Sequence, residues 1–232
     1  MIPAVTDSTQ HRVVRSFVRR EGRMTEGQRR ALEQHWERYG VEQGRDPLDL
    51  DALFGRSAPR RLEIGFGMGE SLLSMAGAVP GIDFLGIEVY RPGVGHLLRE
   101  LQTRDMDNVR VISADAVEVL TDMIPPAALE AIYLFFPDPW PKKRHHKRRL
   151  MNPAFASPAA SRLKPGGVLH MATDWEDYAQ QALEVLEGIS VLRNTAGPRQ
   201  FAPRPEWRTA TRFERRGERL GHGVWDLIFE KR

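Results

Sequence analysis

A single acidic residue, Asp138, stands between two prolines where an apolar run ends and a basic run begins. The apolar run at 131–136 (AIYLFF) is typical of a buried strand, and Trp140 follows the acid two positions later. Residues 142–149 (KKRHHKRR) then hold six Lys/Arg and two His with no acidic residue. This order predicts a strand that delivers one carboxylate, flanked by aromatic side chains, to the edge of a site that binds a polyanion.

The composition bounds the class of protein. The chain has 232 residues, of which 41% are hydrophobic and 28% charged, so we expect a folded globular protein of one or two domains. It has no Cys, which excludes disulfides, thiolate metal sites and Cys nucleophiles. Neither a secretion-signal pattern nor an apolar run of membrane-spanning length is seen, and we expect a cytoplasmic protein without membrane contact.

The net charge of +3 is unevenly distributed. Besides the run at 142–149, residues 11–30 hold seven Arg against two Glu, so the rest of the chain is net acidic. Two basic patches on an acidic body raise the local potential at the places where phosphates could be held. The alternative is that both are solvated surface runs.

The elements that position these residues follow one pattern from residue 60 onward, in which predicted strands alternate with predicted helices. The strands are expected at 61–64, 83–88, 109–113, 131–136, 168–172 and near 224–230, and the helices at 70–78, 93–103, 116–123, 176–187 and 211–220. Pro153 and Pro158 make the segment before Leu163 a poor helix. Residues 197–210, rich in Pro and Arg, read as a long loop.

We therefore predict an α/β domain at 59–232, built on a doubly wound, mostly parallel sheet. Residues 1–58 are expected to be a basic N-terminal arm and helix without a domain of their own. Thr25 is the candidate N-cap of that helix, which would end at Gly40.

Alternate glycines follow the first predicted strand, in the stretch Glu63-Ile-Gly65-Phe-Gly67-Met-Gly69. They allow a tight turn and let a ligand approach the main chain. The stretch lacks the Gly-Lys-Ser/Thr of a P-loop, and Glu70 stands where the dinucleotide motif has its third glycine. A carboxylate before the first glycine would repel a pyrophosphate, so the ligand is expected to be cationic and amine-bearing.

Further acids end the next two strands. Glu88 lies 19 residues beyond Gly69, the interval typical of an acid that binds ribose hydroxyls, and Asp115 is placed to accept a hydrogen bond from an adenine amino group. Because the carboxyl ends of parallel strands meet at one edge of a sheet, we expect Glu63, Glu88 and Asp115 to line one crevice. Each acid taken singly is more commonly a helix cap or an ion-pair partner, whereas the ordered set favours a cofactor site.

This ordered set resembles the class I S-adenosylmethionine-dependent methyltransferases, and further segments resemble one family among them, the tRNA (guanine-N7)-methyltransferases. The segments are RSFVRREGRMT (15–25), LEIGFGMGE (62–70), FLGIEVY (84–90), FFPDPWPKKRHHKRR (135–149), HMATDW (170–175), TRFERRG (211–217) and GHGVWDL (221–227). The resemblance implies a Rossmann-like fold with a seven-stranded sheet, S-adenosyl-L-methionine as cofactor and tRNA as partner. It also implies methyl transfer to N7 of a variable-region guanine.

The resemblance also implies roles for particular residues. Around the cofactor it places Glu63, Gly65, Gly67, Gly69, Glu88, Asp115 and Asp138, and around the substrate Lys142, Asp174, Thr211, Arg212, Phe213 and Glu214. Phosphate contacts are expected from Lys142, Lys143, Arg144, Lys147, Arg148 and Arg149. His145 and His146 are assigned to the same RNA-facing loop, because they lack the carboxylate neighbours of a metal site, and no metal is expected.

Methylation of guanine N7 requires few catalytic groups. N7 carries an in-plane lone pair and no proton, so its methylation requires no base, while the product ring gains positive charge. A carboxylate can stabilise that charge and orient the base, and aromatic side chains can stack on a flipped base. We predict this catalytic role for Asp138, beside Phe136 and Trp140, with alignment to the methyl donor supplying most of the rate. A turn Asp between prolines is the structural alternative.

Two other functions stay open at this point. Asp138-Pro139-Trp140 is similar to the Asp/Asn-Pro-Pro-aromatic motif of adenine-N6 methyltransferases, although Trp140 stands in place of the second proline. The other alternative is a catalytically silent RNA-binding subunit on the same fold, against which the intact set of acids and glycines argues. The sequence leaves the choice between monomer and homodimer open.

Overall fold

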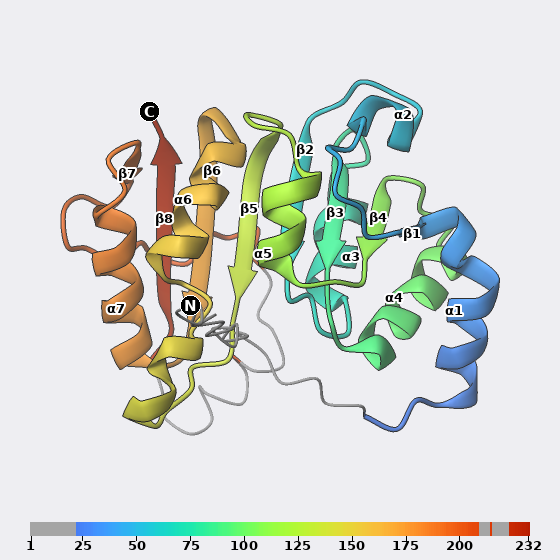
Figure 1. Ribbon diagram of the computed structural model, residues 1–232, viewed down its shortest axis with the longest axis horizontal. Coiled ribbons are helices and arrows are strands. Elements are labelled where there is room, and N and C mark those ends of the chain that lie inside the picture. Colours follow the sequence, from blue (N-terminus) through green and yellow to red (C-terminus); the bar gives the residue numbers. More distant parts are fainter. Residues whose placement is uncertain (1–21, 209–213, 215–222) are drawn as a thin grey trace, which may run out of the picture.

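The computed structural model describes residues 22–208, 214 and 223–232 (Figure 1). Eight strands lie in this part of the chain, and all eight belong to one sheet. They are β1 (Gly40–Val41), β2 (Arg60–Ile64), β3 (Asp83–Ile87), β4 (Val109–Ile112), β5 (Leu129–Phe135), β6 (Leu163–Thr173), β7 (Leu192–Asn194) and β8 (Trp225–Lys231).

The sheet is mostly parallel and doubly wound. Its strand order is β1-β4-β3-β2-β5-β6-β8-β7. The strands from β1 to β6 pair in parallel, whereas β8 is antiparallel to both of its neighbours, β6 and β7. The order reverses between β2 and β5, and a doubly wound sheet opens a ligand crevice at the carboxyl ends of the strands at such a point.

Helices cover both faces of the sheet (Figure 1). They are α1 (Glu26–Tyr39), α2 (Leu50–Phe54), α3 (Glu70–Ala78), α4 (Arg91–Thr103), α5 (Ala116–Glu118), the π-helical turn η1 (Val119–Met123), the 3-10 turn η2 (Lys143–Arg148), α6 (Pro153–Arg162) and α7 (Glu176–Glu187). Residues of α5, η1, α6 and α7 share one buried cluster, and residues of α1, α3 and α4 share the other.

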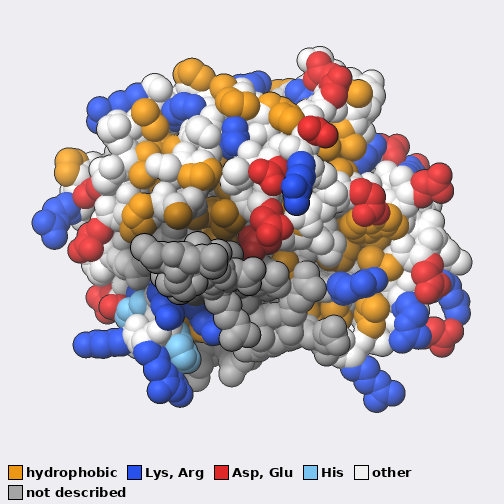
Figure 2. All heavy atoms as spheres, viewed as in Figure 1, with side chains coloured by type: hydrophobic (Ala, Val, Ile, Leu, Met, Phe, Trp, Pro, Cys, Tyr) orange, Lys and Arg blue, Asp and Glu red, His pale blue; other side chains and the backbone are white. Residues whose placement is uncertain are grey.

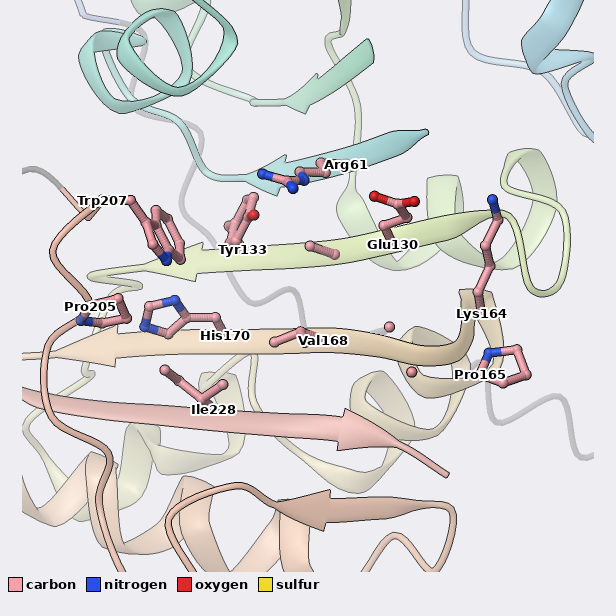
Figure 3. A pocket seen from close by; sticks show the side chains of 13 residues that line it. Arg61, Glu130, Tyr133, Lys164, Pro165, Val168, His170, Pro205, Trp207 and Ile228 are labelled. Carbon is pink, nitrogen blue, oxygen red and sulfur yellow. The ribbon is translucent and has the colours of Figure 1, made fainter. Parts of the chain in front are cut away.

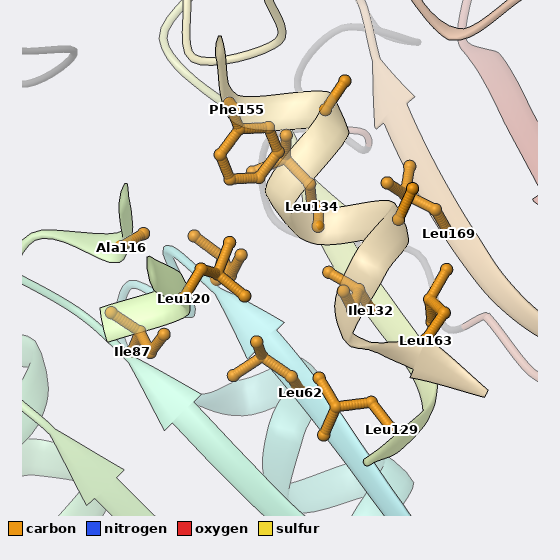
Figure 4. Packing of buried hydrophobic residues seen from close by; sticks show 14 of the residues in the cluster. Leu62, Ile87, Ala116, Leu120, Leu129, Ile132, Leu134, Phe155, Leu163 and Leu169 are labelled. Carbon is orange, nitrogen blue, oxygen red and sulfur yellow. The ribbon is translucent and has the colours of Figure 1, made fainter. Parts of the chain in front are cut away.

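Alternation along the strands divides the core into these two clusters. In β5, Ile132 and Leu134 join the cluster beneath α6, whereas Tyr133 and Phe135 join the cluster on the opposite face. Figure 4 shows Leu62 of β2 packed in the first cluster with side chains from β5, β6 and α6. Period-two alternation of this kind is what a sheet buried on both faces requires.

Several predicted elements are confirmed with small shifts. The helices at 70–78 and 176–187 have the expected bounds, whereas β6 begins at Leu163 rather than at residue 168. The sheet has eight strands rather than seven, and neither β1 nor β7, which have two and three residues, was predicted. The segment expected to be a poor helix forms α6, because Asn152 caps it by accepting a hydrogen bond from the Phe155 N–H (3.2 Å) and Pro153 occupies its first turn. The helix expected at 211–220 lies outside the described residues, apart from Glu214.

The predicted cap of the N-terminal helix is confirmed. The Thr25 hydroxyl accepts from the Gln28 N–H (3.3 Å), and the Gln28 side chain accepts from the Thr25 N–H (2.9 Å). α1 packs on α4, where the absence of a side chain at Gly95 lets the Gln28 backbone approach. Residues 1–21 lie outside the described residues, so the division into an arm and helix at 1–58, without a domain of their own, and a domain at 59–232 stays a prediction. No helix of the described part is long and apolar enough to cross a bilayer.

Candidate active site

The structure brings the three predicted acids to one edge of the sheet. Glu63 is the last residue but one of β2, Glu88 directly follows β3, and Asp115 lies just beyond β4. These three strands are parallel neighbours, with Ile64 in register with Ile87 and Ile87 with Ile112. Their carboxyl ends therefore lie together at one edge of the sheet, beside the switch point between β2 and β5, where a doubly wound sheet has its ligand crevice.

Glu63 is a buried carboxyl group with unused hydrogen-bonding capacity. Only 2% of the residue is exposed, and burial raises its pKa to about 8, although a hydrogen bond from Ser71 opposes the rise and the charge of Glu88 adds to it. Its Oε2 atom is buried and has no hydrogen-bond partner among the described residues. A buried oxygen of this kind fits a ligand that brings a positive charge or an N–H donor.

Glu88 links the end of β3 to the glycine turn. Its carboxylate accepts hydrogen bonds from the backbone N–H groups of Gly67 (2.7 Å), Val89 (2.7 Å) and Tyr90 (2.9 Å). Burial raises the pKa of Glu88 in spite of these three bonds, and the negative charge of Asp138 adds to the rise. Asp138 therefore lies close enough to Glu88 for its negative charge to act on that carboxylate.

The glycine turn leaves open space on its ligand side. Gly65 (φ +72°) and Gly67 (φ +58°) adopt left-handed conformations, and a Cβ added to either would meet nothing of the protein within 4 Å. Gly69 differs, because its Cβ would collide with Leu97 of α4, so it serves helix packing. Gly93 of α4 approaches the Gly67 carbonyl so closely that a Cβ there would lie 1.9 Å from the oxygen.

Asp115 forms the N-cap of α5. It is half-buried, and its side chain accepts a hydrogen bond from the Val117 N–H at 2.9 Å. Its position just beyond the third strand is the predicted one, and the capping bond ties its carboxylate to the start of α5.

The loop that carries Asp138 is held in an unusual conformation. Asp138 is exposed, and both flanking aromatic residues, Phe136 (φ +51°) and Trp140 (φ +45°), have left-handed backbones that bulky residues rarely adopt. The Phe136 N–H donates to the Ala172 carbonyl at 2.8 Å, which ties the start of the loop to β6. Backbone strain of this kind persists where surrounding contacts over-determine it, and it is concentrated at functional sites.

Arg149 anchors the other end of this loop, and the prediction that it contacts phosphate is wrong for the structure described. Its side chain is 1% exposed. Its Nε–H donates to the Pro139 carbonyl (2.8 Å), and its terminal N–H groups donate to Gln181 (2.6 Å) and Asp177 (2.6 Å) of α7. The guanidinium also lies over the Tyr178 ring. Arg149 thus fixes the loop on α7 and does not face solvent.

The other cations of the basic run remain accessible. Lys142, Lys143, Arg144 and Lys147 are exposed, and Arg148 is half-buried with its guanidinium 5.0 Å from the Trp140 ring centroid. Lys, Arg and His side chains gather at the lower left of Figure 2, where the yellow segment of Figure 1 forms η2. Their contact with phosphates stays a prediction.

The two histidines of the run pack inside it. His145 lies edge-on to Trp140 with ring centroids 6.0 Å apart, and His146 lies 3.1 Å from a guanidinium nitrogen of Arg149. Partial burial, together with the surrounding Lys and Arg charges, lowers the pKa of His145. No group of three or more metal-binding side chains occurs in the described part of the chain.

The predicted substrate residues are only partly described. Asp174 directly follows β6 and is half-buried at the same carboxyl edge as the acids. Thr211, Arg212 and Phe213 lie outside the described residues. Glu214 is buried, with its carboxylate ion-paired to Arg208 and Arg204, which the sequence did not indicate.

A hollow lies along the strands of the sheet (Figure 3). It has a volume of about 530 Å³ and runs over β2, β5, β6 and β8, with Arg61, Tyr133, Lys164, His170 and Trp207 in its wall. None of the four predicted acids lines it. The sequence did not indicate this hollow, nor the buried partnership of Arg208 with Asp226 in β8. The one available signal was an acid within the otherwise apolar strand WDLIF.

Comparison with known proteins gives concordant results. A family model described as "Putative methyltransferase" matches residues 57–227. Curated proteins named tRNA (guanine-N(7)-)-methyltransferase are 60% identical over 227 residues in Alkalilimnicola ehrlichii (97% of this chain, 95% of the relative) and 58% identical over 220 residues in Pseudomonas aeruginosa (95% and 90%). A third, from Alcanivorax borkumensis, is 56% identical over 221 residues (95% and 92%).

Solved structures agree on the fold. The aminoglycoside resistance methyltransferase NpmB1 superposes with a TM-score of 0.54 at 13% identity, covering 79% of this chain and 92% of its own. A 30S ribosomal A1408 methyltransferase from an uncultured bacterium gives a TM-score of 0.52 at 14% identity, covering 79% and 93%. At these identities the likeness concerns the fold alone.

Proposed function

The chain belongs to the tRNA (guanine-N7)-methyltransferase family, and we propose that it transfers a methyl group from S-adenosyl-L-methionine to N7 of a guanine in the variable region of tRNA. The observation that carries the site assignment is the meeting of Glu63, Glu88 and Asp115 at neighbouring strand ends beside the open turn at Gly65 and Gly67.

The residues of the crevice fit this cofactor part by part. The buried Oε2 of Glu63 suits the cationic amino-acid portion, Glu88 suits the ribose hydroxyls, and Asp115 suits the adenine amino group. The space beside Gly65 and Gly67 admits the cofactor against the main chain. When bound, the cofactor supplies an electrophilic methyl group on a sulfonium centre.

Asp138 is proposed to orient the guanine and to stabilise the positive charge that its ring acquires. N7 has no proton to lose, so the carboxylate need not act as a base and can instead accept hydrogen bonds from N–H groups on the opposite edge of the ring. Phe136 and Trp140 flank it in the sequence, and Arg149 and the Ala172 carbonyl hold the loop in place. The exposure of Asp138 leaves it accessible to a flipped base.

The accessible cations beyond Asp138 are proposed to bind the tRNA backbone. Lys142, Lys143, Arg144, Lys147 and Arg148 follow the catalytic loop directly, so phosphates held there would place the variable region near Asp138. Such contacts fix position without reading sequence. A cytoplasmic location is part of this proposal because tRNA is the substrate.

The test is product identification. The pure protein is incubated with methyl-labelled S-adenosyl-L-methionine and an unmodified tRNA transcript, and the nucleosides are separated after digestion. We expect labelled 7-methylguanosine, with borohydride and aniline cleavage mapping it to the variable region. A matched transcript with that guanine changed to adenine should take up no label.

Two results would contradict the proposal. Labelled N6-methyladenosine would assign the chain to the adenine class, and binding of tRNA without any label transfer would favour a silent RNA-binding subunit.

A further inference from the structure

Two anchors hold the loop that carries Asp138, and one of them is a side chain. The loop runs from Phe136, which directly follows β5, to Arg149, which directly follows η2. The first anchor is the hydrogen bond from the Phe136 N–H to the Ala172 carbonyl of β6 (2.8 Å). The second is Arg149, whose Nε–H donates to the Pro139 carbonyl at 2.8 Å. The two anchors lie on either side of Asp138 in the chain.

The guanidinium of Arg149 bridges this loop and α7. Its terminal nitrogens donate to Gln181 Oε1 and to Asp177 Oδ2, both at 2.6 Å. Its central carbon lies 4.9 Å from the centroid of the Tyr178 ring. Because the donors of a guanidinium belong to one rigid plane, these bonds fix the direction of the bonded groups as well as their distance.

α7 is packed on the core, so the bridge ties the loop to a fixed part of the molecule. The Tyr178 hydroxyl accepts a hydrogen bond from the N–H of Met151, two residues beyond Arg149 (2.9 Å). The buried residues of α7 are Tyr178, Ala179, Ala182, Leu183 and Leu186. The position of the Pro139 carbonyl is therefore set relative to the core.

The position of Asp138 depends on the backbone beside it. Asp138 is exposed, so the packing of its own side chain does not fix it. The Pro139 carbonyl belongs to the peptide group that leads into Trp140, whose backbone is left-handed (φ +45°). A strained conformation of this kind persists only where surrounding contacts over-determine it. The bond from Arg149 holds that peptide group directly.

We propose that Arg149 is a positioning residue for methyl transfer, which places the Asp138 carboxylate by holding the Pro139 carbonyl. This inference rests on the proposed function, in which Asp138 orients the guanine. It divides the basic run between two tasks, because the accessible cations are proposed to bind phosphate whereas Arg149 acts through Asp138. A displacement of a catalytic group by about 1 Å can lower the rate on the order of 100-fold.

The first test removes the planar fork of Arg149 and keeps its charge. The lysine of Arg149→Lys cannot hold Pro139 and α7 in one geometry. The single-turnover rate of methyl transfer is measured at saturating tRNA and cofactor and is normalised to the concentration of cofactor-binding sites. We expect the rate to fall at least about tenfold. A wild-type rate per site would show that the role of Arg149 is purely structural, and the proposal would be wrong.

The binding constants separate this effect from a loss of substrate affinity. The dissociation constants of cofactor and tRNA should change by less than about threefold in Arg149→Lys, because the Arg149 side chain is buried against the loop and α7. A loss of tRNA affinity large enough to account for the slower reaction would return Arg149 to the phosphate contacts and overturn the proposal.

Arg162→Lys is the matched control. The Nε–H of Arg162 donates to the Leu120 carbonyl (2.7 Å) and a terminal N–H donates to the Thr121 carbonyl (2.9 Å), so this arginine also holds backbone. It directly precedes β6, at the amino end of the strands, whereas Asp138 lies beyond the carboxyl end of β5. Its replacement should leave the rate per site unchanged. Equal losses in Arg162→Lys and Arg149→Lys would contradict a specific role of Arg149.

A double variant tests whether Arg149 acts through Asp138. In the Asp138→Asn protein the carboxylate is already absent, so adding Arg149→Lys should lower the rate by less than about threefold further. The same fold-loss in the wild-type and Asp138→Asn backgrounds would show that Arg149 acts independently of Asp138, which would refute the proposal.

Hydrogen–deuterium exchange gives a readout without tRNA and without turnover. The backbone amides of residues 136–149 should exchange faster in Arg149→Lys than in the wild type, and at the wild-type rate in Arg162→Lys. Unchanged exchange in Arg149→Lys would show that the loop does not depend on this anchor. The product nucleoside of the wild-type protein reports on the proposed function, whereas exchange and the ratio of rates report on Arg149, so either can fail alone.

Discussion

Cofactor binding should displace a proton from Glu63, and replacing this residue with Gln isolates the effect. Burial raises the pKa of Glu63 to about 8 in the free protein. At pH 7 a carboxyl group with this pKa is about 90% protonated. The proposed cofactor brings positive charge to the buried Oε2 atom, which favours the ionised form and lowers the pKa.

The magnitude follows from proton linkage. If the cofactor brings the pKa of Glu63 below about 5, binding at pH 7 releases about 0.9 proton. The affinity then increases with pH, because the ionised form is the one that binds, and it changes close to tenfold per unit between about pH 6 and pH 7. Titration calorimetry in two buffers with different ionisation enthalpies measures the number of protons released, without tRNA and without turnover.

Two variants frame this measurement. Glu63→Gln keeps the volume of the side chain but has no proton to lose, so it should bind cofactor more weakly and with no linked proton release. Glu33→Gln, at an exposed position of α1, should behave as the wild-type protein. Proton release that is absent in the wild type, or equal in wild type and Glu63→Gln, would show that Glu63 does not face the cofactor as an acid with a raised pKa.

Four further outcomes follow from the structure. Glu63 binds its proton more tightly in the folded protein than in the unfolded chain. In the absence of cofactor, the free energy of unfolding of the wild type should therefore fall relative to that of Glu63→Gln as the pH rises from 4.5 to 8. Thermal unfolding at several pH values measures this difference. If about four exposed cations engage phosphates, log affinity for tRNA should fall with log salt at a slope of roughly −3, and Lys143→Ala with Lys147→Ala should reduce the steepness by about 1.5 in filter-binding assays. Arg149→Lys should lower the free energy of unfolding by about 2 kcal/mol in urea titrations and leave that slope unchanged, because Arg149 is buried against α7; a changed slope would restore it to the phosphate contacts. Gly93→Ala should push the Gly67 carbonyl aside and weaken cofactor binding at least about tenfold. Gly81→Ala, whose new Cβ meets nothing within 4 Å, should leave the cofactor affinity unchanged. Equal cofactor affinities of the two variants would show that the turn tolerates the displacement.

The sequence predicted best where a local pattern determines the structure. The cap at Thr25, the amphipathic helix at 176–187 and the acids at the strand ends each depend on neighbouring residues, and each appears where expected. The family resemblance added the assignment of cofactor and substrate. The convergence of Glu63, Glu88 and Asp115 followed from the general geometry of parallel sheets rather than from any contact visible in the sequence.

The features that the sequence did not predict depend on residues far apart in the chain. Six Lys/Arg in the run at 142–149 look alike in sequence, and Arg149 alone is buried because α7 offers it Asp177 and Gln181. Arg208 lay within a predicted loop, and its burial depends on Asp226 in the last strand. β1 and β7 are too short to show periodicity.

The role of Asp138 is the central claim, and its replacement tests the claim most directly. Single-turnover methyl transfer to tRNA is measured for the wild type, Asp138→Ala and Asp138→Asn, each at saturating cofactor and tRNA. We predict a rate at least about 100-fold below wild type for both variants, in line with the loss of a preorganised electrostatic group, while cofactor binding remains measurable. A wild-type rate in either variant would remove the carboxylate of Asp138 from the mechanism.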